Sequence, residues 1–169
     1  MLVSSENFTI KGVVIEINKE TEEEKNESEI RIIDTFIKLI YTFKPDIITA
    51  HNGENFDWNF IIVRCKVLGI DLQKLCEKYF GEGNFIRKEE RESVLKLGGE
   101  IETFHKTIVP DTIVTDSLHA VRRAQATNSS IKRADLKYIT NFLGIKKNNR
   151  VYTPGAEIDK ILEDKVNKY

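Results

Sequence analysis

The stretch that decides the fold reads Asp46-Ile-Ile-Thr-Ala-His51-Asn52-Gly-Glu-Asn55-Phe56-Asp57-Trp58-Asn-Phe60-Ile-Ile-Val63. The apolar run at 47–48 predicts a buried strand, and a polar loop that contains Gly53 leads into a second apolar run that ends at Val67. The pattern predicts a strand, a loop and the start of a helix. Because open α/β sheets place ligand sites at the carboxyl ends of their strands, Asn52 and Asp57 are expected at a functional position.

Asp57 has two interpretations from these residues alone. In the first, it caps the helix that follows, since an aspartate accepts hydrogen bonds from the free amides at a helix start. In the second, its carboxylate carries chemistry at the end of the strand. The surrounding sequence favours the second interpretation.

The string at 47–57, Ile-Ile-Thr-Ala-His-Asn-x-x-x-Phe-Asp, precedes an apolar helix and Leu68-Gly69-Ile70. It resembles the Exo II motif of the DEDD 3′–5′ exonucleases, most closely that of the proofreading exonuclease domain of family B DNA polymerases. The resemblance implies that Asp57 is a catalytic residue that binds metal. It also implies that Asn52 and Phe56 contact the 3′-terminal nucleotides, with a single-stranded DNA 3′ end as the partner.

The resemblance covers roughly residues 10 to 150. The family's leading strand corresponds to 12–17, and its amphipathic helix corresponds to 29–43. Its strand that ends in aspartate and the basic helix after it correspond to 114–123. Its last helix, which ends in Leu-Gly-x-x-Lys, corresponds to 136–147. The resemblance implies an α/β fold, with a ribonuclease H-like mixed sheet flanked by helices.

Two of the family's motifs do not occur in this sequence. No Asp-x-Glu (Exo I) precedes the central motif, and neither Tyr-x-x-x-Asp nor His-x-x-x-x-Asp (Exo III) occurs. The simplest interpretation is an internal piece of a longer exonuclease or polymerase that lacks the first strands of its sheet. Such a sheet has an exposed edge, and we expect this edge to favour a homodimer.

The implied chemistry is two-metal phosphodiester hydrolysis, which needs several carboxylates around two ions. Hard oxygen ligands select Mg²⁺ or Mn²⁺. Asp57 alone cannot hold both ions, so we expect this chain by itself to be inactive. Asp116 matches a family position that ends a strand near the site and is not an established metal ligand.

Composition indicates one ordinary globular domain over residues 1–169, with 40% hydrophobic and 31% charged residues. No apolar run is long enough for a membrane span and no signal pattern begins the chain, so we expect an intracellular, cytoplasmic protein.

Cys65 and Cys76 lack zinc or redox spacing and are expected to be buried free thiols.

The remaining elements follow from periodicity and turn residues. We expect a strand over 8–17, a solvated acidic loop over 18–29, a helix over 30–43, and helices over 58–68 and 72–80. Residues 84–110 are expected to form an inserted β-hairpin, and a short polar helix is expected to begin near Glu157.

The stretch from 122 to 150 carries eight cations against the single acid Asp135, a net charge of +7 in a chain of net charge −1. This asymmetry suits a surface that faces nucleic-acid phosphates. The expected contacts come from four residues of the stretch: Arg122, Arg123, Lys132 and Arg133. The alternative is a basic helix face that is balanced by the acidic loop.

Two classes of function therefore stay open. The first is a fragment of a metal-dependent, proofreading-type 3′–5′ exonuclease that acts on DNA, within a family B polymerase-like protein. The second is a non-catalytic module with a ribonuclease H-like fold that binds nucleic acid or a partner protein. Flanking sequence with Asp-x-Glu upstream and Tyr-x-x-x-Asp downstream would favour the first.

Overall fold

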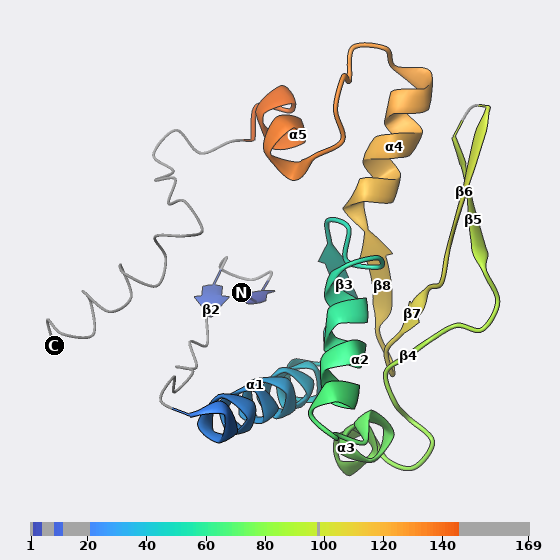
Figure 1. The fold of residues 1–169 in the computed structure, drawn as a ribbon. Helices are drawn as coiled ribbons and strands as arrows, with labels where there is room; N and C mark the ends of the chain where they lie inside the picture. The colour runs from blue at the N-terminus through green and yellow to red at the C-terminus, as the bar shows by residue number, and fades with distance from the viewer. Residues whose placement is uncertain (1, 5–8, 12–20, 98, 146–169) are drawn as a thin grey trace, which may run out of the picture.

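The computed structural model describes residues 2–4, 9–11, 21–97 and 99–145 (Figure 1). Most of the strand expected over 8–17, and the helix expected near Glu157, lie outside the described residues. The described elements, in chain order, are β1 (Leu2–Ser4), β2 (Thr9–Lys11), α1 (Glu22–Phe43), β3 (Ile47–Ala50), α2 (Asp57–Val67), α3 (Leu72–Phe80), β4 (Arg87–Lys88), β5 (Ser93–Leu97), β6 (Glu100–Phe104), β7 (Thr107–Ile108), β8 (Ile113–Asp116), α4 (Ser117–Thr127) and α5 (Leu136–Phe142).

Helix α1 begins earlier than expected. The acidic run was predicted to be a solvated loop, but the helix starts at Glu22 and is 22 residues long. The side chains of Thr21 and Glu24 form a capping box, each bonding the backbone amide of the other residue. Three glutamates in the first turn also suit the positive end of the helix dipole. The loop prediction was therefore wrong for residues 22–29, because charge alone does not reveal a cap.

Strands β3 and β8 form a parallel pair in which Ala50 lies opposite Asp116. The pairing places the loop after β3 beside the end of β8, although more than sixty residues separate them. Ile48 and Val114 pack against the helical core, while Ile47 and Ile113 are 58% and 63% exposed. A parallel pair packed against helices on one face confirms the predicted α/β fold class.

The core lies between α1, α2 and α3, which gather at one end of the molecule (Figure 1). Its buried residues are Ile33, Ile37, Ile40, Trp58, Cys65, Cys76, Ile86 and Val109. Both cysteines are free and buried, as predicted. Burial raises the pKa of the Cys65 and Cys76 thiols, so neither is poised as a nucleophile or metal ligand.

Two antiparallel ribbons lie between α3 and β8. Strand β4 pairs with β7, and β5 pairs with β6 from Ser93 opposite Phe104 to Leu97 opposite Glu100. The β5–β6 hairpin runs beside α4 (Figure 1), where the centroids of the Phe104 and His119 rings are 4.2 Å apart. Within the described residues, no helix has both the length and the apolar character needed to cross a bilayer.

Candidate functional site

The loop of residues 51–56 joins the end of β3 to the start of α2. Asp57 is the first residue of α2, and the preceding N-cap, Phe56, makes no side-chain capping bond. Asp57 is exposed, and within the described part of the chain its carboxylate has no hydrogen-bond or ion-pair partner. The capping interpretation of Asp57 is therefore wrong, and the carboxylate is left available to a ligand.

Asn52 and Phe56 lie on the same loop as Asp57. Asn52 has a left-handed backbone with φ of 70°, a conformation that asparagine tolerates better than most residues. Its carbonyl accepts a 2.9 Å hydrogen bond from the amide of Phe56. The Phe56 ring is 65% exposed. The loop thus presents an amide side chain, an aromatic ring and a carboxylate within six residues of sequence.

Asp116 lies beneath this loop and is 8% exposed. Its Oδ1 accepts hydrogen bonds from the amides of Asn52 (2.8 Å) and Leu118 (2.9 Å), and its Oδ2 accepts one from the amide of Glu54 (3.0 Å). Three amides thus occupy most of the roughly four lone-pair sites of the carboxylate. Asp116 acts on the backbone and has little capacity left to bind a metal ion.

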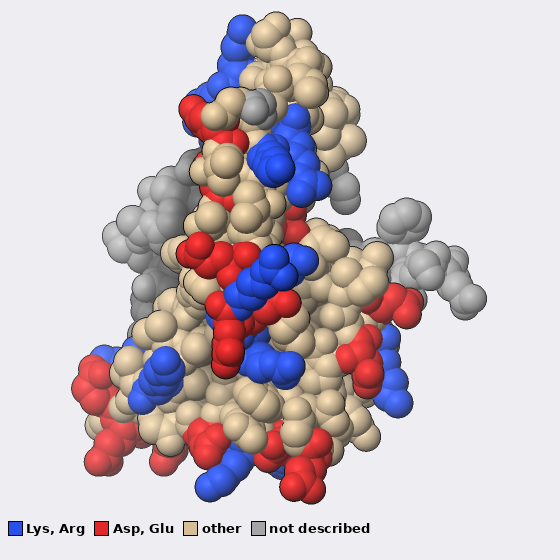
Figure 2. Space-filling view, turned by 90° about the vertical axis from the view of Figure 1, so that its right-hand side faces the viewer, with Lys and Arg blue, Asp and Glu red and all other residues tan. Residues whose placement is uncertain are grey.

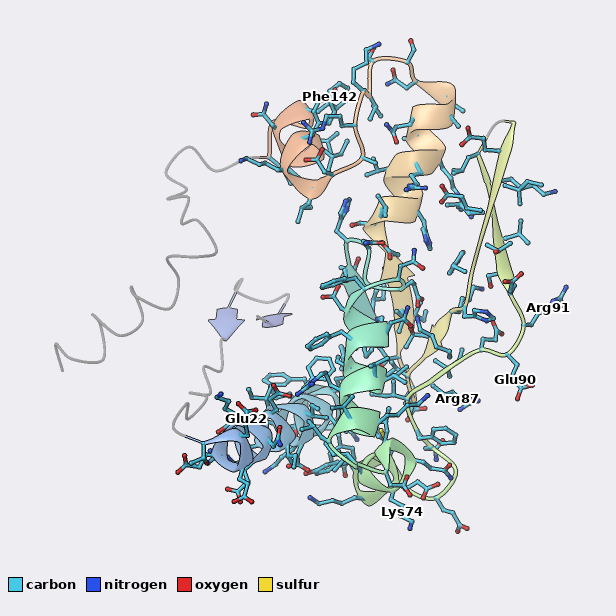
Figure 3. The ribbon with its side chains drawn as sticks, viewed as in Figure 1. Glu22, Lys74, Arg87, Glu90, Arg91 and Phe142 are labelled. Atoms are coloured by element: carbon cyan, nitrogen blue, oxygen red, sulfur yellow. The ribbon has the colours of Figure 1, made fainter. Side chains whose placement is uncertain are left out.

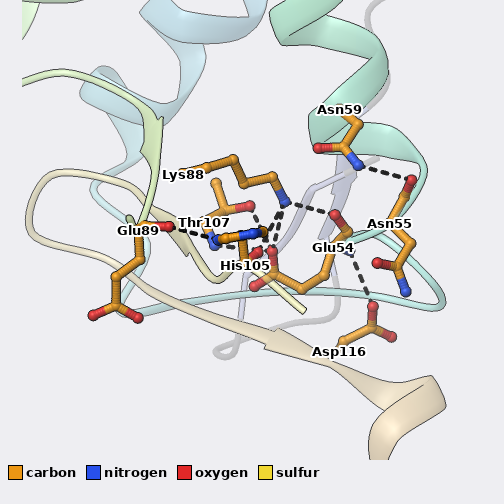
Figure 4. A network of polar contacts seen from close by, with 8 residues as sticks. All are labelled: Glu54, Asn55, Asn59, Lys88, Glu89, His105, Thr107 and Asp116. Carbon is orange, nitrogen blue, oxygen red and sulfur yellow. Dashed lines mark hydrogen bonds and ion pairs between the residues drawn. The ribbon is translucent and has the colours of Figure 1, made fainter. Parts of the chain in front are cut away.

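Glu54 anchors the other side of the loop (Figure 4). Its side chain is 3% exposed, and Oε2 accepts from the ammonium of Lys88 (3.0 Å) and from the amide (2.9 Å) and hydroxyl (2.6 Å) of Thr107. The Lys88 ammonium also donates to the carbonyls of Glu54 (2.6 Å) and His105 (3.2 Å). The network fastens the loop to strands β4 and β7.

His51 fastens the loop to the chain before α5. Its Nε2 donates to the carbonyl of Ala134 at 2.8 Å, because a carbonyl oxygen only accepts. Its Nδ1 lies 3.0 Å from the hydroxyl of Ser117, the first residue of α4. The loop is therefore held from three directions, by His51, Glu54 and Asp116.

Gly53 is the one glycine of the loop, and a Cβ at this position would lie 2.5 Å from the Cβ of Ala50. We expect Gly53→Ala to lower the free energy of unfolding by about 1–3 kcal/mol, because the fixed backbone cannot relieve this overlap. Gly99→Ala is the matched control, since a Cβ there meets no atom within 4 Å. Urea denaturation measures both, and equal effects of the two substitutions would contradict the close approach at Gly53.

The four predicted phosphate contacts lie on α4 and on the segment between α4 and α5. Arg122 pairs with Glu102 of β6, and Arg133 pairs with Asp135 at 2.8 Å. Arg123 and Lys132 are exposed. The amide of Tyr138 and the guanidinium of Arg133 lower the pKa of the Asp135 carboxyl, so this partner is charged at neutral pH. Two of the four cations are thus already paired within the chain.

The alternative interpretation expected the acidic residues 22–29 to balance these cations. The ion pairs of the described residues do not show such a balance. Among the described residues, Arg122 and Arg133 pair with acids of β6 and of the α5 cap, while Glu29 of the acidic run pairs with Arg64 of α2. Acidic and basic side chains are intermixed on the face that carries the β5–β6 hairpin (Figure 2).

The described residues do not provide a complete metal centre. No group of three or more histidine, cysteine, aspartate or glutamate side chains suited to a metal ion occurs among them. Asp57 offers a hard oxygen ligand of the kind that Mg²⁺ or Mn²⁺ prefers. One free carboxylate does not fit a two-metal site by itself, so these residues alone do not support a catalytic step.

Glu54, Lys88 and Thr107 were not predicted as site residues. Glu54 lies within the central motif, and a glutamate between a glycine and an asparagine in a loop is normally solvated. Lys88 lies in a mixed-charge run, which is equally ordinary on a surface. No local signal in the sequence marks this pair, since its members lie 34 residues apart.

The comparison with known families gives a match over residues 4–139 to the exonuclease domain of DNA polymerase family B. This match covers well over half of the 169-residue chain. The chain belongs to this exonuclease-domain family. The resemblance inferred from the central motif is confirmed, and the loop that holds Asp57 is part of the matched domain.

Two kinds of polymerase share shorter stretches with this family B exonuclease domain. The catalytic subunits of DNA polymerase epsilon from Emericella nidulans and Aspergillus fumigatus are 43% identical over 47 residues, which is 28% of this chain and 2% of theirs. DNA polymerase 2 of Aeropyrum pernix is 32% identical over 50 residues, which is 30% of this chain and 6% of its own. The matched region thus spans a small part of each relative.

Proposed function

We propose that this chain is the Exo II-bearing part of a metal-dependent 3′–5′ exonuclease domain that acts on DNA in a proofreading role. Asp57 is the proposed metal ligand and catalytic carboxylate, and Asn52 and Phe56 are the proposed contacts to the 3′-terminal nucleotides. The observation that carries the proposal is the geometry of the loop. Asp57 is exposed and unpartnered within the described residues, while hydrogen bonds of Asp116 and Glu54 hold the loop around it.

The metal in this proposal is Mg²⁺ or Mn²⁺, because carboxylate oxygens select hard cations. Asp57 supplies one ligand, and the remaining carboxylates are proposed to come from sequence outside this chain. In a complete domain, such ions would supply Lewis-acid chemistry for phosphodiester hydrolysis. The chain alone is therefore proposed to be inactive and, in the cell, to be part of a longer polymerase-like protein in the cytoplasm. We treat it as one partial domain, with 84–110 as an insertion.

Binding of single-stranded DNA tests the proposal directly. We expect a 5′-labelled oligonucleotide with a free 3′ end to bind the chain, and Phe56→Ala to weaken binding by about 10-fold, because an aromatic ring stacks on a base. Phe142→Ala is the matched control, since Phe142 is 42% exposed and lies on α5, apart from the 51–56 loop (Figure 3). Fluorescence anisotropy measures both affinities. A circular single strand, which has no 3′ end, should compete less well than a linear strand for the binding of the labelled oligonucleotide if the 3′ end is recognised.

Salt dependence separates the loop from the basic residues. Affinity should fall with salt by a slope of about −0.7 per phosphate neutralised in log–log form, and alanine at Arg122, Arg123, Lys132 and Arg133 should flatten that slope. An unchanged slope would assign these four residues to a solvated face. Equal affinities of Phe56→Ala and Phe142→Ala would remove the loop from the proposed site.

A partner-binding module is the second candidate, and exposed apolar surface favours it. Helix α2 is apolar on more than one side, and Phe60, Val63 and Val67 are each more than half exposed. An apolar groove of about 310 Å³ lies between α1 and α2, with Phe36 and Phe60 among its walls.

Within the described residues, β3 has β8 as its hydrogen-bonded neighbour on one edge. A homodimer through the other edge would appear as a concentration-dependent mass in sedimentation equilibrium.

A further inference from the structure

The carboxylate of Asp116 contacts the segments that follow both strands of the parallel pair. It belongs to β8 and caps α4 through the amide of Leu118, yet it also accepts hydrogen bonds from Asn52 and Glu54, on the loop after β3. The loop amides are 64 and 62 residues away in sequence. One buried side chain therefore satisfies the backbone of two different elements.

This carboxylate holds the loop at Asn52, where the backbone is left-handed. A left-handed asparagine costs conformational free energy and persists where its surroundings hold it. Asp116 holds the amide of Asn52, and the carbonyl of Asn52 in turn accepts from the amide of Phe56, which is the N-cap of α2. A continuous chain of hydrogen bonds thus runs from Asp116 to the residue before Asp57.

We propose that Asp116 is a positioning residue that fixes the Asn52–Asp57 loop in the conformation that receives the DNA 3′ end. This inference rests on the proposed function for its ligand. It assigns Asp116 neither to metal binding nor to the chemical step. Its effect passes through the backbone amides of Asn52 and Glu54, so it acts on all the side chains that the loop presents.

The competing explanation is that Asp116 is only the N-cap of α4. Asp71 shows what a simple cap does in this protein, because its carboxylate accepts from a single backbone amide, that of Lys74 at 3.1 Å, and stabilises α3. Asparagine caps a helix about as well as aspartate. An Asp→Asn change therefore retains the cap at either position, and at Asp116 it also removes a loop contact.

Amide hydrogen exchange in Asp116→Asn separates the two explanations. The amide oxygen of Asn keeps the bonds made by Oδ1 to Asn52 and Leu118, while its NH₂ group replaces Oδ2 and faces the N–H of Glu54. We expect exchange at Glu54 to accelerate by about 10-fold or more, because its amide loses a hydrogen bond to a charged group, with exchange at Leu118 unchanged. Asp71→Asn should change neither amide. Parallel changes at Glu54 and Leu118, or no change at Glu54, would overturn the positioning role.

Binding of single-stranded DNA by the full chain is the second readout. We expect Asp116→Asn to weaken binding of the free 3′ end by about 10-fold, the effect of losing one hydrogen bond to a charged group. The direction is informative, because removing a negative charge would by itself strengthen binding to DNA. Asp71→Asn removes the same charge far from the loop and should not weaken binding.

The two readouts distinguish failure of this inference from failure of the proposed function. If Phe56→Ala weakens binding and Asp116→Asn does not, the positioning role is overturned and the proposed function stands. If the chain does not bind DNA, or Phe56→Ala has no effect, the proposed function fails at this loop. Amide exchange at Glu54 then still decides whether Asp116 holds the loop.

Discussion

Replacing Lys88 by methionine is expected to lower the free energy of unfolding by about 3 kcal/mol. The change leaves the carboxylate of Glu54 buried without its cation, since the Glu54 side chain is 3% exposed and the Lys88 side chain is 20% exposed. Two carbonyls, of Glu54 and His105, also lose a donor. Urea denaturation followed by the fluorescence of Trp58, the single tryptophan, measures the loss.

Lys74→Met is the matched control for Lys88→Met. Lys74 lies on α3 and points away from the fold (Figure 3), and its pair with Asp71 is 3.6 Å long and open to water. Its replacement should change stability by no more than about 0.5 kcal/mol. The double change Glu54→Gln with Lys88→Met should be more stable than Lys88→Met alone, because a neutral amide still accepts from Thr107. Equal losses for the two lysine variants would contradict the buried pair.

Asp57→Asn is expected to abolish Mg²⁺-dependent 3′ trimming, by about 100-fold or more, in a longer protein that carries this domain together with the proposed additional carboxylates. Loss of a group that only orients a metal ligand costs about 10- to 100-fold, so loss of a ligand itself should cost at least as much. Stability should stay within about 0.5 kcal/mol, because Asp57 is exposed and makes no capping bond. Trimming of a labelled single strand and thermal melting measure the two quantities.

Asp46→Asn supplies the matched control at the other end of β3. Asp46 is also exposed, and it directly precedes Ile47, the first residue of the strand. Its replacement should leave both trimming and melting unchanged. If the longer protein keeps full activity with asparagine at 57, Asp57 is not a metal ligand and the proposed chemistry of the loop is wrong.

Local signals in the sequence were sufficient for the elements around the site. The apolar pair at 47–48, the polar loop and the apolar run to Val67 predicted β3 and α2, and both elements occur. The helix predicted over 72–80 also occurs, as α3, with Asp71 as its N-cap. These features depend on residues that lie within a few positions of each other, and the strength of such interactions is a property of the local sequence. The α/β class and the family followed from the same stretch.

Local signals failed where a cap or a long-range contact decided the outcome. Charge predicted a loop over residues 22–29, but the capping box at Thr21 started a helix there. Capping by Asp57, one of the two interpretations that the local residues allowed, does not occur, since the N-cap of α2 is Phe56 and makes no side-chain bond. Asp71 and Asp116 each precede a helix and cap it, so the sequence does not distinguish their roles. The structure distinguishes them, because Asp116 also accepts hydrogen bonds from the loop after β3.

By itself, the sequence determined which residues the loop presents: Asn52, Phe56 and Asp57 follow a strand and precede a helix. Only the tertiary structure decided how the loop is held. The parallel pairing of β3 with β8 places Ala50 beside Asp116, and the β4–β7 ribbon brings Lys88 and Thr107 to Glu54. These contacts join residues 34 to 66 positions apart, where no periodic pattern links the partners. Their strength comes from burial, because a carboxylate removed from water requires the amides or the cation that only the folded chain brings to it.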